Sequence, residues 1–435
     1  MTITGRLVAL LLLGLAPVVA FGRDAATAGW ILLGWLAGCL LLACLDAALA
    51  ASPRTLLVER GPVETIRLGQ EAASLLSIEQ LGRRTLRGIV RDAWEPSAGA
   101  PRMRAKVTLP PGERRVIDST LRPTRRGTRR ARFVAVRSLG PLGLAGRQVV
   151  LDAPGELRVL PPFESRRHLP SRLARLRELD GRTSLMVRGQ GTEFDSLRDY
   201  VRGDDIRSID WRATARRQDL VVRTWRPERD RRVIVVIDSG RAAAVRVADE
   251  TRLDTSIEAS LLLAALASRA GDRVEVLALD RLVRARVQAA SGAQLLPRIV
   301  EAMADVEPEL LETDWAAVPA LVAGMTNRRA LVVLLTAIDS AGQAEELLEA
   351  VPQLARKHLV VVANAIDPDV AASVRARTDV ISTYRAAAAE RALLDQERVR
   401  LALAQLGAEV VDGPPQELPP RLADRYLELK KAGRL

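Results

Sequence analysis

The side chains that carry most enzyme chemistry are scarce in this chain. Its 435 residues include two histidines, two cysteines and four lysines, against sixty-one arginines. Cys39 and Cys44 lie in an apolar stretch, which excludes a disulfide framework and a thiolate beside a histidine. His168 and His358 are far apart and lack the flanking ligands of a zinc site. Because no lysine follows a glycine, a phosphate-binding loop ending in Gly-Lys-Ser/Thr is also excluded.

The densest group of polar side chains lies between residues 191 and 232. Asp204, Asp205 and Asp210 could hold one or two divalent metals for hydrolysis of a phosphoester or an amide. Arginines stand at nearly every neighbouring step, however, and would compete with a dication for the same oxygens. The segment has no histidine to activate a serine or threonine nucleophile. A metal-dependent hydrolase is therefore the alternative, and we favour a protein-docking surface or an ion-pair seam between domains.

The same segment contains signals for a turn, a helix and two large anchors. Gly203 permits a tight turn, and Asp204 or Asp205 can cap a short helix predicted within residues 206–216. Tyr200 and Trp211 are two of the few large side chains in the protein. We expect both to act as anchors.

Residues 1–50 predict a membrane hairpin of two transmembrane helices. Residues 25–45 are apolar throughout and supply the roughly 20 residues that a helix needs to cross a bilayer; residues 7–22 are also apolar but fewer. The small residues around Ala20 leave a cleaved signal peptide as the competing interpretation. Arg6 precedes the two apolar stretches and Arg54 and Arg60 follow them, whereas the single Arg23 between them is offset by Asp24. The positive-inside rule therefore places the later domains in the cytoplasm, at the inner membrane.

Residues 51–165 predict a basic, β-rich domain. Short alternating or β-branched runs such as SLLSIEQ and RRVIDSTL, separated by glycine and proline, indicate an antiparallel sandwich or a small barrel. The stretch holds 21 Arg and Lys against 11 Asp and Glu, so it carries +10 of the formal net charge of +12. We expect it to bind anionic membrane lipids. Because aromatic residues that stack on bases are few, we expect no nucleic-acid partner.

Residues 166–230 predict an Arg/Asp-rich connector, and residues 231–435 an α/β domain with C-terminal helices. The runs RVIVVID, VEVLALD, ALVVLLT and LVVVANAI are apolar throughout, as in strands buried on both faces. Helical stretches between them indicate a doubly wound parallel sheet. The arrangement resembles the von Willebrand factor A fold. The expected fold class is therefore a membrane hairpin, an all-β sandwich-like domain and an α/β doubly wound, von Willebrand A-like domain.

Asp238, which ends the first apolar run, is the candidate metal ligand that this resemblance implies. The fold it implies builds a metal site from Asp-x-Ser-x-Ser, a distant threonine and a later aspartate. This chain has Gly240 and Ala242 at the two serine positions, and Ala337 follows Thr336. Three of the oxygens that Mg²⁺ requires are therefore missing, which leaves Asp238, Thr313 and Asp339. We expect a degenerate site without metal, with Asp238 as a turn or helix cap.

One long segment carries a second and more specific resemblance: Arg198-x-Tyr200-x-x-Gly203-Asp204-Asp205-x-Arg207-x-Ile209-Asp210-Trp211-x-x-Thr214-Ala215-Arg216. Further matches are Gly140-Pro141-Leu142-Gly143-Leu144 and Val222-x-x-Trp225-x-x-Glu228. The segment is similar to the signature of the bacterial "domain of unknown function 58" family. The resemblance implies a membrane-anchored protein with a β-rich segment and a von Willebrand A-like domain, often encoded beside a MoxR-type AAA+ ATPase and without established enzymatic activity.

These observations predict a membrane-anchored, non-enzymatic adaptor or scaffold that needs no cofactor. The resemblance implies that it binds a MoxR-type AAA+ ATPase through the von Willebrand A-like domain and the signature segment. The alternative is a metal-dependent hydrolase that uses Asp204, Asp205 and Asp210. Membrane lipids are the other expected partner.

Overall fold

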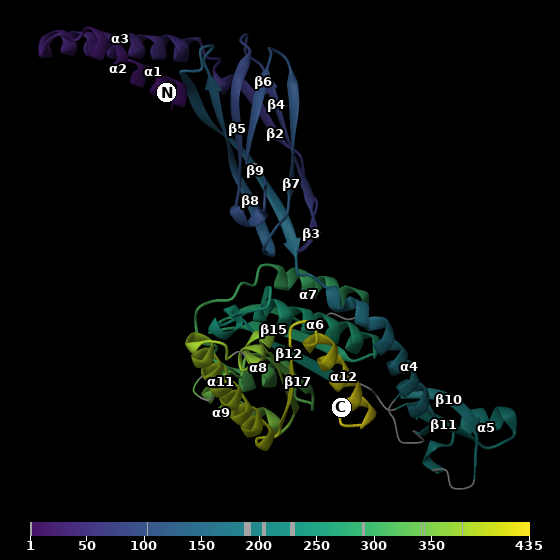
Figure 1. The fold of residues 1–435 in the computed structure, drawn as a ribbon. Coiled ribbons are helices and arrows are strands. Elements are labelled where there is room, and N and C mark those ends of the chain that lie inside the picture. Colours follow the sequence, from purple (N-terminus) through teal and green to yellow (C-terminus); the bar gives the residue numbers. More distant parts are fainter. Residues whose placement is uncertain are drawn as a thin grey trace. The chain divides into compact units, whose positions relative to one another are not determined.

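The computed structural model describes residues 2–101, 103–186, 193–201, 206–226, 231–288, 292–340, 342, 344–375 and 377–435. The chain divides into two compact units, residues 1–162 and residues 163–435 (Figure 1). Each unit has its own sheets and its own core, and each is described by itself.

The first unit begins with three apolar helices, α1 (Gly5–Leu13), α2 (Leu15–Phe21) and α3 (Ala25–Leu49). Within the described residues, α3 is the one helix long and apolar enough to cross a membrane, which confirms an N-terminal helix of that kind; the run Gly5–Phe21 is shorter. The Trp35 indole packs beside Gly14, where a Cβ would lie 2.3 Å from Trp35 Cδ1. Trp35 Nε1 also donates to Leu10 O at 3.1 Å, so the two short helices pack against α3.

The strands of the first unit form two sheets. The six-stranded sheet has the order β1 (Thr2–Ile3), β9 (Ala145–Leu160), β8 (Gly127–Leu139), β5 (Leu86–Trp94) and β6 (Arg104–Leu109), with β3 (Ile66–Arg67) beside β9. The three-stranded sheet has the order β2 (Leu56–Arg60), β4 (Ala72–Gln80) and β7 (Arg114–Leu121). Two short 3₁₀ helices complete the unit, η1 (Pro53–Thr55) and η2 (Pro96–Ala98).

Alternate residues of both sheets point into a shared core. Leu76 and Ile78 of β4 pack in one cluster with Leu86 of β5 and Val134 and Val136 of β8. Every strand pair is antiparallel except β3 with β9. The alternation of buried and exposed residues along β4 therefore follows directly from the period of two in a strand. The sheets of this segment confirm the predicted β-rich character.

A buried ion pair lies inside this sandwich. Arg60 Nη2 and Asp92 Oδ1 are 2.6 Å apart, and the two side chains are 3% and 7% exposed. Arg60 also donates to Ser74 Oγ at 3.0 Å and to Ala153 O at 3.2 Å. Arg60, counted in the sequence among the arginines that follow the apolar stretches, thus lies with its side chain inside the sandwich. Its guanidinium is enclosed by the core because Asp92 and these oxygens satisfy its donors.

The second unit is built on a six-stranded sheet. Its order is β16 (Val283–Val287), β15 (Arg273–Leu279), β12 (Arg232–Asp238), β17 (Leu331–Leu335), β18 (Leu359–Ala365) and β19 (Ala408–Gly413). Neighbouring strands are parallel, except that the edge strand β16 runs antiparallel to β15. β17 and β18 are buried along their whole length, as the apolar runs predicted. The α/β character of this part is confirmed.

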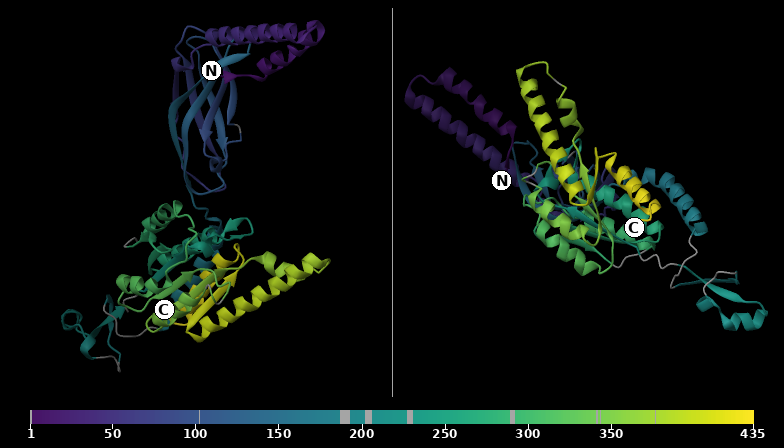
Figure 2. Two further views of the ribbon diagram at one scale, coloured as in Figure 1. Left: turned by 90° about the vertical axis from the view of Figure 1, so that its left-hand side faces the viewer. Right: turned by 90° about the horizontal axis from the view of Figure 1, so that it is seen from below.

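Helices cover both faces of this sheet (Figures 1 and 2). One face carries α6 (Arg252–Arg269) and α12 (Leu418–Lys431), with α4 (Leu169–Met186) and α7 (Leu295–Ala304) packed against α6. The other carries α8 (Val318–Met325), α9 (Glu345–Ala355) and α11 (Val380–Gln405), whose apolar residues join one core cluster with the strands.

Shorter elements connect these parts. They are α10 (Pro368–Ser373), the two-stranded pair β13 (Arg246–Val247) and β14 (Glu250–Thr251), and the 3₁₀ helices η3 (Glu164–His168), η5 (Arg241–Ala244), η6 (Gly292–Gln294) and η7 (Trp315–Ala317). The segment predicted as a polar connector, residues 166–230, contains α4 and the end of η3.

Candidate functional site

The signature segment folds into a small hairpin with a helix. β10 (Glu193–Asp199) pairs antiparallel with β11 (Val221–Arg226), and η4 (Ile206–Ser208) and α5 (Trp211–Arg217) lie between them in sequence (Figure 1). Tyr200 N donates to Leu220 O at 2.7 Å, which extends the hairpin by one bond. Gly203, Asp204 and Asp205 lie outside the described residues, as does the side chain of Arg207.

Two polar residues of the signature hold this hairpin together. Asp210 is the N-cap of α5, and its Oδ1 accepts from Arg212 N and Ala213 N, each at 3.0 Å. Thr214 Oγ1 accepts from Val221 N at 3.1 Å. The predicted cap at Asp204 or Asp205 lies outside the described residues; within them, α5 starts at Trp211 and its capping carboxylate is Asp210, the residue directly before it. Backbone N–H groups at the start of α5 thus already donate to one of the two Asp210 carboxylate oxygens.

Apolar side chains of the signature segment are unusually exposed. Trp211 is 65% exposed and Ile206 67% exposed, and Val201 and Leu220 are exposed as well. Trp211, expected to act as an anchor, is therefore not an anchor within the core of this unit, where Val221 and Val222 are buried instead. The Arg212 and Arg216 residues of α5 are also exposed, whereas Arg198 Nη1 donates to Asp199 O at 3.1 Å. Exposed aromatic and aliphatic groups beside arginines are typical of a protein interface.

The carboxyl edge of the parallel sheet centres on Asp238, which is 3% exposed at the end of β12. Its Oδ2 accepts from Thr336 Oγ1 at 2.6 Å. Its Oδ1 accepts from Gly240 N at 2.8 Å and from the Thr313 hydroxyl. Burial raises the pKa of Asp238, and these hydrogen bonds act in the opposite direction. The structure thus brings together Asp238, Thr313 and Thr336, and internal donors satisfy the carboxylate.

Two further carboxylates at this edge are paired with arginines. Asp339 accepts from both terminal nitrogens of Arg252, with Nη2 to Oδ1 at 2.8 Å. Asp280, at the end of β15, accepts from Arg284 Nε at 2.6 Å. Burial alone would raise the pKa of Asp280, but the Arg284 and Leu282 hydrogen bonds outweigh it and lower the pKa. Sequence reasoning missed Asp280, although it ends an apolar run by the same signal as Asp238.

A close approach explains why residue 240 is a glycine. A Cβ there would lie 2.3 Å from Thr313 Oγ1 and 2.7 Å from Leu311 O. A serine at this position, as an oxygen site of the Asp-x-Ser-x-Ser kind requires, would displace Thr313 or the Leu311 backbone. Within the described residues, no group of three or more His, Cys, Asp or Glu is arranged to hold a metal ion.

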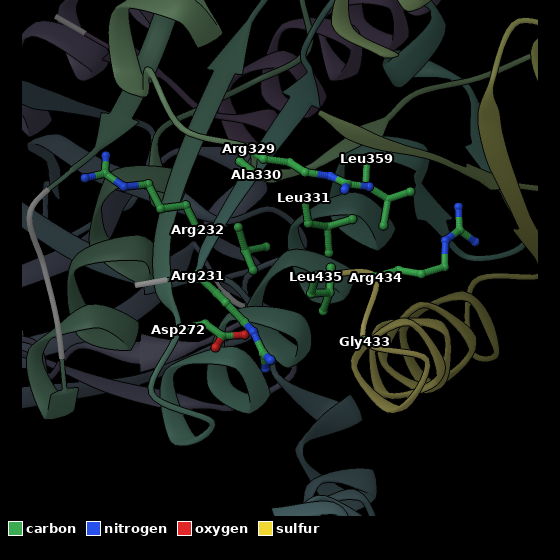
Figure 3. Close-up of a pocket in the computed structure, with 11 residues that line it drawn as sticks. Arg231, Arg232, Asp272, Arg329, Ala330, Leu331, Leu359, Gly433, Arg434 and Leu435 are labelled. Atoms are coloured by element: carbon green, nitrogen blue, oxygen red, sulfur yellow. The ribbon is translucent and has the colours of Figure 1, made fainter. Parts of the chain in front are cut away.

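A cavity of about 260 Å³ opens at the opposite, amino-terminal edge of the same sheet (Figure 3). Its apolar wall includes Leu331 and Leu359, and its rim carries four arginines (Arg231, Arg232, Arg329 and Arg434). Asp272 also lines it, but Asp272 Oδ1 accepts from Lys430 Nζ at 3.2 Å, and its Oδ2 from the Tyr426 hydroxyl. The one carboxylate side chain in the wall is therefore paired from within. Two of the rim arginines also have acidic partners: Arg434 pairs with Glu409, and Arg232 Nη1 lies 3.7 Å from Glu275 Oε1.

Comparison with known proteins identifies a family domain. Residues 196–400 match the model of a family described as "Protein of unknown function DUF58". Uncharacterized proteins of Mycobacterium bovis and of two Mycobacterium tuberculosis strains are 25% identical over 185 residues, which is 42% of this chain and 57% of each relative. This chain therefore spans somewhat over half the length of these curated relatives.

Two solved structures illustrate the matches to known folds. A CARDB domain from Pyrococcus furiosus is 18% identical and covers 24% of this chain and 91% of its own, with a TM-score of 0.18. A β-glucosidase from Listeria innocua is 14% identical and covers 24% of this chain and 16% of its own, with a TM-score of 0.17. At these scores the similarities carry no inference about fold or chemistry.

Proposed function

We propose that this protein is a membrane-anchored, non-enzymatic adaptor, and the premise is the match of residues 196–400 to the DUF58 family of proteins of unknown function. It binds a partner protein through the signature hairpin. The observation that carries the proposal is the exposure of Trp211 and Ile206 on a hairpin whose polar signature residues Asp210 and Thr214 make internal hydrogen bonds.

The residue types on the hairpin fit a docking surface. Tryptophan and arginine are the side chains most enriched among the residues that dominate binding energies. A large apolar side chain in water loses the favourable free energy of burial, about 2 kcal/mol for a group of this size. Capture by a partner recovers that free energy at Trp211 and Ile206, while Arg212 and Arg216 are placed to pair with its carboxylates.

The partner in this proposal is a MoxR-type AAA+ ATPase, as the family resemblance implies. We also propose that the second unit is a von Willebrand A-like domain. The strand order β16-β15-β12-β17-β18-β19, with one antiparallel edge strand, supports this assignment. Thr313 and Thr336 donate hydrogen bonds to Asp238, which supports a role for the carboxyl edge of the sheet as a rigid binding surface. Of the three carboxylates of the hydrolase alternative, Asp210 caps α5, and Asp204 and Asp205 lie outside the described residues.

The membrane anchor in this proposal is the hairpin of α3 with the shorter α1 and α2. Its support is the apolar length of α3 and the packing of Trp35 against Gly14. The soluble units lie on the cytoplasmic side, where the ATPase and its nucleotide are found. Arg54, Arg84 and Arg147 near the end of α3 support that orientation.

Co-purification tests the adaptor function directly. The full chain, in detergent, is passed over an immobilised MoxR-type ATPase as wild type, as Trp211→Ala with Ile206→Ala, and as the control Tyr384→Ala. Tyr384 is 75% exposed on α11, so the control removes an equally exposed aromatic group elsewhere. We expect the double variant to bind at least about tenfold more weakly and the control to bind normally. Unchanged binding by the double variant contradicts the docking surface, and absence of wild-type binding contradicts this partner.

A further inference from the structure

We propose that the outer face of the six-stranded sheet of the first unit is a lipid-binding surface that lies against the anionic bilayer. The proposal rests on the membrane anchor proposed above and deepens it by naming the surface that meets the lipid. Four observations carry it: a lattice of cations, apolar groups among them, an acidic opposite face, and the attachment of α3.

The cations come from three adjacent strands and share one face. They are defined here as the basic lattice: Arg87 and Arg91 of β5, Arg104 and Lys106 of β6, and Arg137 of β8. Arg91 stands opposite Arg104, and Ile89 stands opposite both Lys106 and Arg137. Residues in register across strands point to the same side, so the five side chains form one patch.

The charge of this basic lattice is not neutralised by the protein. All five side chains are exposed, and Arg137 donates to the neutral Gln148 at 3.2 Å. In the part of the chain that the structure describes, none of the five forms an ion pair. Like charges on neighbouring strands destabilise a sheet unless an anion lies over them. Such a patch is therefore complementary to a surface of phosphate groups.

Apolar groups lie among these cations. Val150 of β9 stands opposite Ala135 and is 57% exposed, and Ile89 is partly exposed at the centre of the lattice. A shallow hollow of about 490 Å³ lies between Arg91 and Arg104, lined also by Ala100, Pro101 and Met103. Arginine stems that cover apolar surface while their heads reach phosphates are characteristic of the membrane interface.

The opposite face of the sandwich differs in charge, although it also exposes the apolar side chains of Leu57, Leu75 and Val116. The outward residues of β2, β4 and β7 include Glu59, Glu79 and Asp118 against Arg114, which pairs with Glu59 at 2.9 Å. An anionic bilayer would repel this face. Charge complementarity thus selects one of the two faces of the same sandwich.

The membrane helix is fixed to the six-stranded sheet. Asp46 of α3 is fully buried, and its carboxylate accepts from Leu142 N, Leu144 N and Ala145 N at 2.8, 2.7 and 2.9 Å. Arg147 of β9 also donates to Ala47 O at 2.9 Å. Both Figure 1 and Figure 2 show α3 running across the direction of the strands. A helix that follows the membrane normal therefore lays the strands along the bilayer surface.

Fluorescent labels on the two faces test the proposal in the full chain. With Cys39 and Cys44 replaced by alanine, a single label is placed at Thr108→Cys on β6 or, as the matched control, at Thr120→Cys on β7; both threonines are exposed. The protein is reconstituted in phosphatidylcholine vesicles with and without phosphatidylglycerol, and with a lipid that quenches fluorescence from its headgroup. We expect quenching at residue 108 that requires phosphatidylglycerol and falls with added salt, and none at residue 120.

A charge variant separates the basic lattice from general electrostatics. Arg87→Gln, Arg91→Gln and Arg104→Gln together should reduce quenching at residue 108 to the level at residue 120. The matched control, Arg114→Gln, Arg115→Gln and Arg122→Gln, removes the same charge from β7 and its flank and should leave quenching unchanged. Equal quenching at both labels, no quenching at either, or no effect of the first triple variant overturns the proposal.

Two readouts distinguish failure of this proposal from failure of the anchor. If alkaline carbonate extracts the wild-type protein from the vesicles, the membrane anchor itself is wrong. If the protein resists extraction but residue 108 is not quenched, the anchor stands and the lipid-facing surface is overturned. Salt-sensitive binding of duplex DNA that the first triple variant abolishes, without quenching at residue 108, overturns it in favour of a nucleic-acid surface.

Discussion

The carboxyl group of Glu250 makes the stability of the second unit depend on pH. Burial raises its pKa from the usual 4.5 to about 7, the negative charges of Glu258, Asp254 and Glu164 add to that shift, and a hydrogen bond from Thr255 Oγ1 at 2.8 Å opposes it. The folded protein therefore keeps a proton that the unfolded chain releases near pH 4.5. The contribution of Glu250 to stability is therefore greatest below that pH and is lost as the pH rises toward 7.

Replacing Glu250 by glutamine should remove this loss. The neutral amide can accept the Thr255 hydrogen bond without a charge to desolvate. We expect the Tm of Glu250→Gln to rise relative to wild type as the pH is raised from 5 to 8, while the two proteins differ least at the acid end. Thermal unfolding of both proteins across that range measures the effect. A difference in Tm that does not change with pH would show that Glu250 does not titrate there.

At the scale of elements, hydrogen bonds connect α3 to the loop between β8 and β9. The loop contains the Gly140-Pro141-Leu142-Gly143-Leu144 sequence, and a Cβ on Gly140 would lie 2.2 Å from both Asp46 O and Asp46 Oδ1. Gly143 has a φ of +70°, which glycine adopts without strain. Both glycines thus let the loop bring three N–H groups onto one carboxylate.

Removing that carboxylate should loosen the helix from the sheet. Asp46→Ala leaves the three N–H groups buried without an acceptor, which costs about 2 to 4 kcal/mol of the free energy of unfolding of the first unit. Denaturation of the full chain in detergent measures the loss. Asp152→Ala, which removes an exposed carboxylate of β9, is the control and should be nearly neutral. Equal stability of the two variants would exclude Asp46 as the connecting group.

The elements that the sequence predicted well are those with a strong apolar pattern. The run RVIVVID coincides with β12, and LVVVANAI covers β18. The helix α4 was missed although Leu169, Leu173 and Leu176 follow a helical spacing, because arginines and a glycine obscured it. The edge strand β16 was missed because its exposed charged residues interrupt the apolar pattern on which strand prediction relies.

The candidate site was predictable in part for the same reason. A strand-end aspartate near a distant threonine was expected, and Asp238 does accept from Thr313. The pairing of Arg252 with Asp339 joins residues 87 positions apart, so no local pattern indicates it. The exposure of Trp211 likewise could not be read from residue type, because tryptophan is more often buried.

Over the whole chain, charge and function divide between the two units. Residues 51–165 carry +10, whereas residues 166–435 hold 42 basic and 40 acidic residues. The proposed lipid surface lies in the first unit, and the proposed docking hairpin lies in the second. Separate cores support this division: Leu76 and Val136 belong to one cluster, and Val236 and Val332 to another.

This division predicts that residues 163–435 fold and bind without the first unit. The six-stranded sheet and its helices bury their own apolar residues, so the isolated fragment should stay soluble without detergent and unfold cooperatively on heating. It should bind the ATPase about as tightly as the full chain, since the hairpin lies within it, and should not bind phosphatidylglycerol vesicles. Calorimetry, the same pull-down and vesicle sedimentation measure the three properties. A fragment that folds but binds vesicles as the full chain does would move the lipid surface into the second unit, while loss of ATPase binding would place part of the docking surface in the first.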